Sequence, residues 1–328
     1  MKIDGSDHFD PFLELRRRTA RVCEHFPAMY WSDIRRLRDY PFAFLRSLTQ
    51  FKLMALTVPT NSGGAGLGIG AACAVVEEAH KLGCDFGRID LQYALCFALS
   101  HQVDAMKRLP WMLDVASGHS RLQMCNIFQD NASLAVQSTA AGFRLDGKAA
   151  WPERTEHCDL GLLIAHRVGC EQREMFVVNV KATPGVSLRA QWTHPTNGQV
   201  FLLASNATVG SSELVSAADK VAGRAVAAKK LLRCASLVGD AQADYLATVS
   251  GCYTSKGVDE CAVNGRKAIR AAAFALSDAA RLLDDDIECS QEIASAEEGA
   301  QRAVRTVAQL ADVRHQGDSA KHRTSKKC

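Results

Sequence analysis

The sequence has no long apolar run. None of its apolar stretches approaches the roughly 20 residues that a membrane-spanning helix requires, and the opening MKIDGSDHFDPFLELRRR lacks the apolar centre of a secretory signal. The formal net charge of +3 over 328 residues is too small to suggest a nucleic-acid or membrane surface. We therefore expect a cytoplasmic protein that has neither a nucleic acid nor a membrane as its partner.

The sequence also lacks paired metal ligands and the common catalytic signatures. Its 12 cysteines are scattered singly, with no CxxC and no paired histidine, so we interpret most of them as small apolar core residues in a reducing compartment. No metal site is predicted. There is also no GxSxG, no HExxH, no Walker loop and no GxGxxG after a strand.

What the sequence does have is an apolar periodicity that changes twice. Helical spacing runs to about Gly118, short alternating or continuous apolar runs fill Leu122 to Ser216, and helical spacing returns after Ala217. This predicts an α+β protein with a helical domain over 1–120, a small antiparallel β domain over 121–216 and a helical bundle over 217–328. Asp146-Gly147 predicts a tight hairpin turn within the β domain.

Four segments resemble motifs of the acyl-CoA dehydrogenase family, in the family's order and at its intervals. They are LTVPTNSGGAGLG with the following AACAVVEEAHKLG (56–83), MKRLPWMLDVASGHSRLQM (106–124), GFRLDGKAAWPERTEHCDLGLLIAHR (142–167), and TPGVSL with SNATVGSSELV (183–188 and 205–215). Taken alone, GGAGLG is more simply a structural loop in which glycines allow a close backbone approach. Together the segments cover almost the whole chain, and the resemblance implies the same three-part fold.

The resemblance also implies FAD as cofactor and an acyl thioester as substrate. Enzymes of the family remove the α proton with a carboxylate while hydride passes from the β carbon to the flavin. The positions that match the family's ring-binding segments are Gln129, Asn131, Ser133, Trp151, Glu153 and Arg154. An alternative is that Trp151 is an ordinary core residue beside a surface turn.

The resemblance does not supply a catalytic base. The family usually carries it in a YEGT-containing loop, and this chain stops at Cys328, just past VRHQGDS, as in a C-terminally truncated member. The family's other position, on the first C-terminal helix, falls at Lys229 or Lys230, and a protonated lysine cannot act as this base. Glu153 is the one acid that can be placed near the expected flavin face, so the catalytic residue stays unassigned.

Two functions remain open from the sequence. The first is a divergent flavoenzyme acting on an acyl group that is carried on CoA or on an acyl-carrier protein. The second is a non-catalytic partner subunit in a mixed oligomer of acyl-CoA dehydrogenase type. Both imply a homo-oligomer or a hetero-oligomer with a related subunit.

Overall fold

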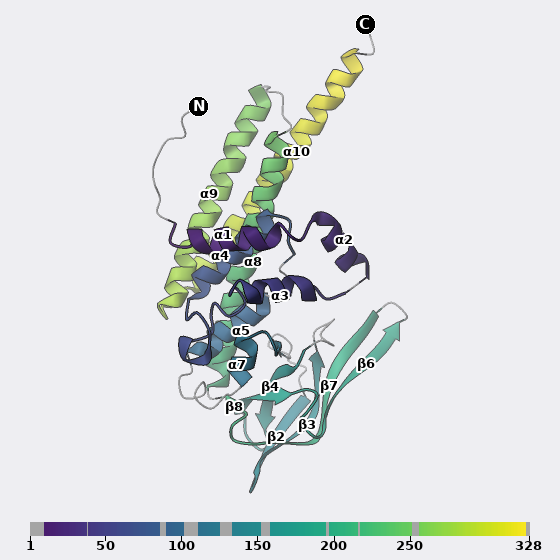
Figure 1. The fold of residues 1–328 in the computed structure, drawn as a ribbon, viewed down its shortest axis with the longest axis vertical. Helices are drawn as coiled ribbons and strands as arrows, with labels where there is room; N and C mark the ends of the chain where they lie inside the picture. Colours follow the sequence, from purple (N-terminus) through teal and green to yellow (C-terminus); the bar gives the residue numbers. More distant parts are fainter. Residues whose placement is uncertain are drawn as a thin grey trace.

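The fold has three parts in chain order, a group of helices, a β-sheet and three long helices (Figure 1). The computed structural model describes residues 10–37, 39–85, 90–101, 111–124, 133–151, 158–194, 197–215, 217–250 and 256–325. The predicted fold class is confirmed in this order of helices, strands and helices.

The N-terminal helices are short and amphipathic. They are α1 (Leu13–Cys23), α2 (Ala28–Leu37), α3 (Phe42–Gln50), the 3₁₀ turn η1 (Thr60–Ser62), α4 (Ile69–Lys81), α5 (Asp90–Ser100) and α7 (Trp111–Ala116). Helix α4 is the central one, because almost all of its residues are buried. It packs against α1 on one side and against the C-terminal helices on the other.

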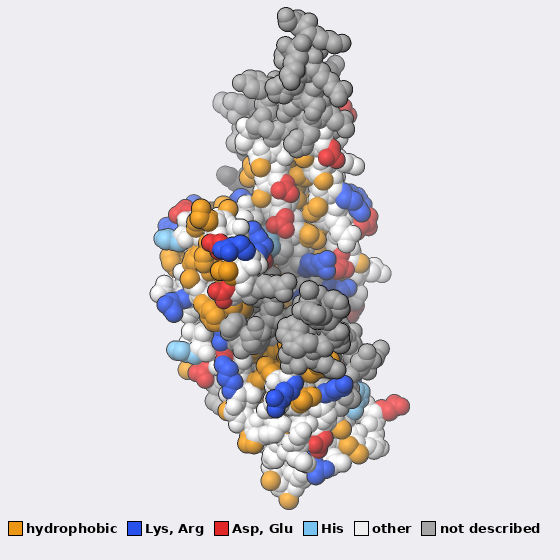
Figure 2. All heavy atoms as spheres, turned by 90° about the vertical axis from the view of Figure 1, so that its right-hand side faces the viewer, with side chains coloured by type: hydrophobic (Ala, Val, Ile, Leu, Met, Phe, Trp, Pro, Cys, Tyr) orange, Lys and Arg blue, Asp and Glu red, His pale blue; other side chains and the backbone are white. Residues whose placement is uncertain are grey.

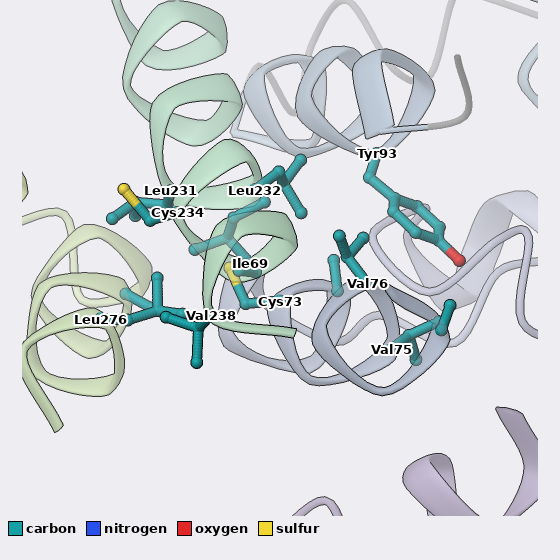
Figure 3. Close-up of a cluster of buried hydrophobic side chains, with 14 of the residues drawn as sticks. Ile69, Cys73, Val75, Val76, Tyr93, Leu231, Leu232, Cys234, Val238 and Leu276 are labelled. Carbon is teal, nitrogen blue, oxygen red and sulfur yellow. The ribbon is translucent and has the colours of Figure 1, made fainter. Parts of the chain in front are cut away.

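The C-terminal helices are α8 (Ala218–Ser250), α9 (Lys256–Asp284) and α10 (Ser290–Ser325). The apolar stripe predicted from Leu231, Cys234, Val238 and Ala241 is buried along α8. Figure 3 shows these side chains meeting Ile69 and Cys73 of α4 and Leu276 of α9 in one core. No helix in the described part of the chain is both long and apolar enough to cross a membrane.

Helices α4 and α8 cross at very short range. A Cβ atom on Gly239 of α8 would lie 2.4 Å from the carbonyl oxygen of Glu77 and 2.7 Å from the Cβ of His80. Only glycine leaves room for the two backbones at this crossing. The adjacent carboxylate of Glu77 accepts a hydrogen bond from Nε2 of Gln242 at 2.6 Å and pairs with Nη2 of Arg16 at 2.8 Å, so α1, α4 and α8 share one buried polar contact.

The glycine-rich loop before α4 is structural. Gly66 adopts a φ of 64°, and a Cβ on Gly68 would lie 2.3 Å from the carboxylate of Asp284. That carboxylate accepts the N–H groups of Ile69 at 2.5 Å and Gly70 at 3.1 Å. Asp284 at the end of α9 therefore caps the first turn of α4, where helix N–H groups otherwise lack partners.

The sheet has eight strands in the order β6-β7-β3-β2-β4-β5-β8, with β1 paired to β4. Their bounds are β1 (Leu122–Met124), β2 (Ser133–Thr139), β3 (Gly142–Trp151), β4 (Leu160–Arg167), β5 (Arg173–Asn179), β6 (Val186–His194), β7 (Asn197–Val209) and β8 (Leu214–Val215). The antiparallel prediction is wrong for two pairs, since β1 and β2 both run parallel to β4. The reason is that β3 turns back beside β2 on one side, whereas β4 crosses to the other side of β2.

The predicted hairpin at Asp146-Gly147 is also wrong. Gly147 has a φ of 123° inside β3, at a bulge where the register with β7 shifts. The carboxylate of Asp146 accepts the N–H of Asn206 on β7 at 2.7 Å. This hydrogen bond joins β3 and β7 at the bulge. The turn between β2 and β3 lies earlier, at residues 140–141.

Candidate functional site

The end of β3 carries the site's most buried aromatic side chain. Trp151 is only 1% exposed, and its ring covers Gly161 of β4, where an added Cβ would lie 3.0 Å from the indole. The indole nitrogen Nε1 is buried and has no hydrogen-bond partner among the described residues. A buried N–H without a hydrogen-bond partner costs about 1–3 kcal/mol of stability. This end of the sheet therefore contains a buried donor whose hydrogen bond is not made.

Of the other predicted flavin contacts, only Ser133 lies in the described part of the chain. Ser133 is the first residue of β2 and pairs with Lys148 of β3 in the backbone ladder. Gln129, Asn131, Glu153 and Arg154 lie outside the described residues. The undescribed segment 125–132 follows Met124, which pairs with Leu162, one residue from Gly161. The segment 152–157 follows Trp151 directly.

Arg121 links this sheet end to the N-terminal helices. Its Nε contacts the carboxylate of Asp159 at 3.1 Å, and Asp159 lies two residues before Gly161. Its guanidinium also lies over two aromatic rings of the α2–α3 connection, 5.6 Å from the ring centre of Tyr40 and 5.1 Å from that of Phe42. Such cation–π contacts stabilise by about 0.5–2 kcal/mol each.

The charges at this junction favour an ionised Asp159. Burial disfavours the carboxylate, but hydrogen bonds from Lys181 at 2.9 Å and from Arg121 outweigh it and lower the pKa of Asp159. Nη1 of Arg121 is buried and has no partner. The junction therefore presents two unpaired donors, Nη1 of Arg121 and Nε1 of Trp151.

Sequence reasoning identified Trp151 but missed Arg121. Arg121 falls inside the segment 106–124 that resembles the family, at a position where the motif itself gives no role to a basic side chain. Its partners Tyr40, Phe42 and Asp159 are between 38 and 81 residues away along the chain. No local pattern in the sequence could have grouped them.

The two lysines to which the resemblance assigns the family's second base position both lie on α8. Lys229 is half-buried on α8, and Lys230 is exposed and pairs with Glu297 of α10 at 3.5 Å. One buried acid that interacts with the charge of Lys229 is Asp90 at the start of α5. Burial raises the pKa of Asp90 to about 6, and the positive charge of Lys229 partly opposes this rise.

The described residues fit a flavin. A flavin ring and its ribityl chain are rich in oxygen and nitrogen acceptors, which suits two buried N–H donors that have no partner. Within the described part of the chain, no three His, Cys, Asp or Glu side chains are grouped as a metal ion would require.

Comparison with known proteins gives matches to one part of the chain and to its fold. Residues 12–118 match the family model described as acyl-CoA dehydrogenase, N-terminal domain. No curated protein matches the sequence. A subunit of the ChsE4-ChsE5 complex from Mycobacterium tuberculosis is 18% identical, with 91% of this chain and 84% of that one aligned at a TM-score of 0.68.

Two further solved structures share the fold. The glutaryl-coenzyme A dehydrogenase in its glutaryl-CoA complex is 16% identical over 96% of this chain and 86% of that chain, with a TM-score of 0.75. PigA with FAD and proline is 13% identical over 94% and 88%, with a TM-score of 0.73. The order of helices, mixed sheet and helices is thus the acyl-CoA dehydrogenase fold. Residues 12–118 thus match the N-terminal domain of the acyl-CoA dehydrogenase family, and the chain as a whole shares the fold of these structures.

Proposed function

We propose that this protein is a divergent flavoprotein that binds FAD at the end of β3 and acts on an acyl thioester. The observation that carries the proposal is the buried indole of Trp151, which packs against Gly161 and whose N–H has no partner among the described residues, at the sheet end where the family resemblance puts the flavin ring. The similarity to structures titled with FAD and with glutaryl-CoA supports the same cofactor and substrate class.

The residues of the chain have distinct roles in this proposal. Trp151 provides the apolar wall for the ring and one hydrogen-bond donor, and Arg121 provides a second donor held in place by Asp159. Gln129, Asn131, Ser133, Glu153 and Arg154 complete the cofactor contacts. The bound flavin supplies the two-electron redox chemistry, and the protein supplies position and exclusion of water.

A second candidate is a partner subunit that lacks its own base, and the observation that favours it is specific. Lys229 and Lys230 stand at the α8 position where a carboxylate is needed, and a positively charged side chain repels the proton it would have to accept. The solved structure of the ChsE4-ChsE5 complex has this fold, and its name joins two chains. In this role the chain pairs with a related, complete subunit.

The first test is the visible spectrum of freshly purified protein, with Trp151→Phe as the diagnostic variant. Phenylalanine keeps an apolar ring but removes the N–H, so we expect at least about a tenfold weaker flavin affinity, in line with the loss of one buried hydrogen bond. Trp31→Phe is the matched control, because Trp31 is also buried but lies in the N-terminal helices. Unchanged flavin occupancy in Trp151→Phe would count against the assignment.

The second test is turnover. We expect the protein alone not to desaturate ordinary saturated acyl-CoA substrates at a normal rate, because a positioned base is worth about 10²–10⁴-fold. Dye or ferricenium reduction over short, medium and branched acyl-CoAs measures this. Robust turnover would show that a base is present, and Glu153→Gln would then test whether Glu153 is that base. Turnover only after mixing with a related subunit would support the partner role.

A further inference from the structure

Two buried cysteines meet where helix α1 ends. Cys23 is the last residue of α1, and Cys84 lies two residues beyond the C-cap of α4. The two residues are 6% and 1% exposed and belong to the same hydrophobic core. Their side chains are close enough for one thiol to hydrogen-bond to the other. Neither cysteine is among the residues assigned to the flavin site.

Helices α1 and α4 lie side by side and run in the same direction (Figure 1). An added Cβ on Gly70, in the first turn of α4, would lie 3.5 Å from the ring of Phe12, just before α1. Further along both helices, Nη2 of Arg16 meets the carboxylate of Glu77 at 2.8 Å. The same register, continued toward the ends of the two helices, leads to the cysteines.

The chain beyond α4 turns back onto the helix and keeps Cys84 in this register. Gly83 adopts a φ of 79°, and the N–H of Cys84 donates at 2.9 Å to a carbonyl in the last turn of α4. Cys23 is seven residues beyond Arg16, and Cys84 is seven residues beyond Glu77. An ion pair and, about two helical turns further on, a pair of thiols therefore join α1 to α4.

The hydrogen bond between the thiols makes them chemically unequal. Cys23 donates to the sulfur of Cys84, and this bond lowers the pKa of Cys84, with a smaller contribution from the indole of Trp31 and opposition from burial. The same bond, together with burial, raises the pKa of Cys23. Cys84 is therefore the thiol that ionises first, and the thiolate is the nucleophile in sulfur chemistry.

Only a thin layer of the protein covers the pair. Three residues that adjoin the cysteines along the chain, Glu24, Gly83 and Asp85, are exposed. Helix α2 has one buried residue, Trp31, which contacts Cys84. Figure 2 faces the side of the molecule that carries α2, and hydrophobic side chains gather on the lobe at its left. A helix held by one buried side chain opens locally at low cost, and this opening gives a small oxidant a route to the thiols.

We propose that Cys23 and Cys84 form a reversible disulfide when the protein meets a peroxide. The thiolate of Cys84 attacks one peroxide oxygen and becomes a sulfenic acid, while the other oxygen leaves as hydroxide and takes up a proton to give water. The sulfur of Cys23 then attacks the sulfur of Cys84, and the displaced hydroxide leaves with the proton of Cys23 as a second water. The two thiols lose two electrons in total, and one peroxide molecule is reduced.

The disulfide closes a covalent ring over residues 23–84, which contains α2, α3 and α4. Closing this ring restricts the unfolded chain, so the oxidised protein is more stable than the reduced protein. In a reducing compartment such a bond is transient and reports the presence of an oxidant. This modification goes beyond the proposed function, and it does not depend on a bound flavin.

The test is oxidation of the full chain by hydrogen peroxide, followed by blocking of the remaining thiols and non-reducing peptide mass mapping. We expect a peptide with Cys23 joined to one with Cys84, lighter than their sum by two hydrogen atoms, and its disappearance after dithiothreitol. The melting temperature should rise by about 5 °C on oxidation. Cys73 and Cys234 of the same core (Figure 3) are the internal control and should be recovered as blocked thiols, because burial raises the pKa of both.

Single variants separate the roles of the two sulfurs. Cys23→Ser should leave a sulfenic acid on Cys84 that dimedone traps, whereas Cys84→Ser should leave Cys23 as a thiol. Cys170→Ser is the matched control on an exposed cysteine and should form the same disulfide as the wild type. Recovery of both Cys23 and Cys84 as thiols in wild type whose Cys170 is oxidised overturns the proposal, and so does a bond from Cys23 to any other cysteine. These wild-type results decide the matter even where a variant fails to fold.

Discussion

At the scale of single residues, two glycines in one helix differ in what surrounds them. Gly239 faces the backbone of α4, whereas a Cβ on Gly223 would meet nothing within 4 Å. We expect Gly239→Ala to destabilise the protein by about 1–3 kcal/mol through overpacking. Gly223→Ala should stabilise it by about 0.5–1 kcal/mol, because alanine loses less backbone freedom in a helix. Urea denaturation measures the change in the free energy of unfolding for both variants. Equal changes in the two variants would contradict the close crossing of α4 and α8.

Asp90 should make stability depend on pH in a definite direction. Its pKa of about 6 in the folded protein is above the ordinary aspartate value of 3.8, chiefly through burial, with Lys229 and His80 lowering it and Asp85 raising it. The protonated carboxyl is therefore favoured in the folded state. Its stabilising contribution is fully present below about pH 4 and is lost as pH rises through about 6, with a span of up to about 3 kcal/mol.

The measurement is the free energy of unfolding of wild type and Asp90→Asn between pH 4 and pH 8. Asparagine does not titrate, so the free energy of unfolding of the variant should increase relative to that of the wild type as pH rises. The other ionisable groups remain in both proteins and largely cancel in the difference. A difference that is constant over this range would show that Asp90 has an ordinary pKa.

At the scale of elements, the start of α4 depends on a residue from the end of α9. We expect Asp284→Ala to cost about 0.5–2 kcal/mol, as for the loss of a helix N-cap. Asp285→Ala is the control, because Asp285 is exposed and makes only a surface ion pair with Arg281 at 3.5 Å. The melting temperatures of the two variants are measured by thermal unfolding. Equal melting temperatures would show that Asp284 does not stabilise the start of α4.

Elements defined by local periodicity were predictable, and those defined by distant partners were not. The stripe of α8 and the strand runs of β4 and β5 follow from apolar spacing alone, so the sequence predicted them. The acidic run that begins at Asp284 looks like a solvated helix end, but two of its members have specific partners. Asp284 caps α4, and Asp286 pairs with the buried Arg224 at 2.5 Å.

The candidate site was predictable in part for the same reason. Trp151 lies in a segment that resembles the family, so its position could be carried over. The parallel pairing of β2 with β4 could not, because a strand's own residues do not show which neighbour it takes. The Arg121 contact with Tyr40 and Phe42 needs the whole tertiary fold.

At the scale of the whole molecule, the long C-terminal helices expose apolar side chains. Phe274 of α9 is 76% exposed and Val263 is 51% exposed, and their spacing of 11 positions brings both to the same face of the helix. Exposed patches of this kind mark contacts between chains. We therefore expect self-association, or pairing with a related subunit, through α9.

Sedimentation at micromolar concentration tests this association. Val263→Glu with Phe274→Glu should shift the protein to a smaller species, because two buried charges without partners oppose the contact. Gln301→Glu on the exposed face of α10 is the control and should sediment as wild type. A monomer in the wild type, both alone and mixed with a related subunit, would contradict the expectation.

The cap that Asp284 places on Ile69 also has a consequence for how the chain acquires its structure during translation. Ile69 and Asp284 are 215 residues apart, so at about 5–20 residues per second the ribosome releases the cap roughly 10–40 s after the helix it completes. The core of α4 is shared with α8 and α9, and during this interval its apolar face has no final neighbours. The N-terminal helices therefore complete their packing only after the C-terminal helices have been synthesised. A fragment that contains the N-terminal helices alone should aggregate.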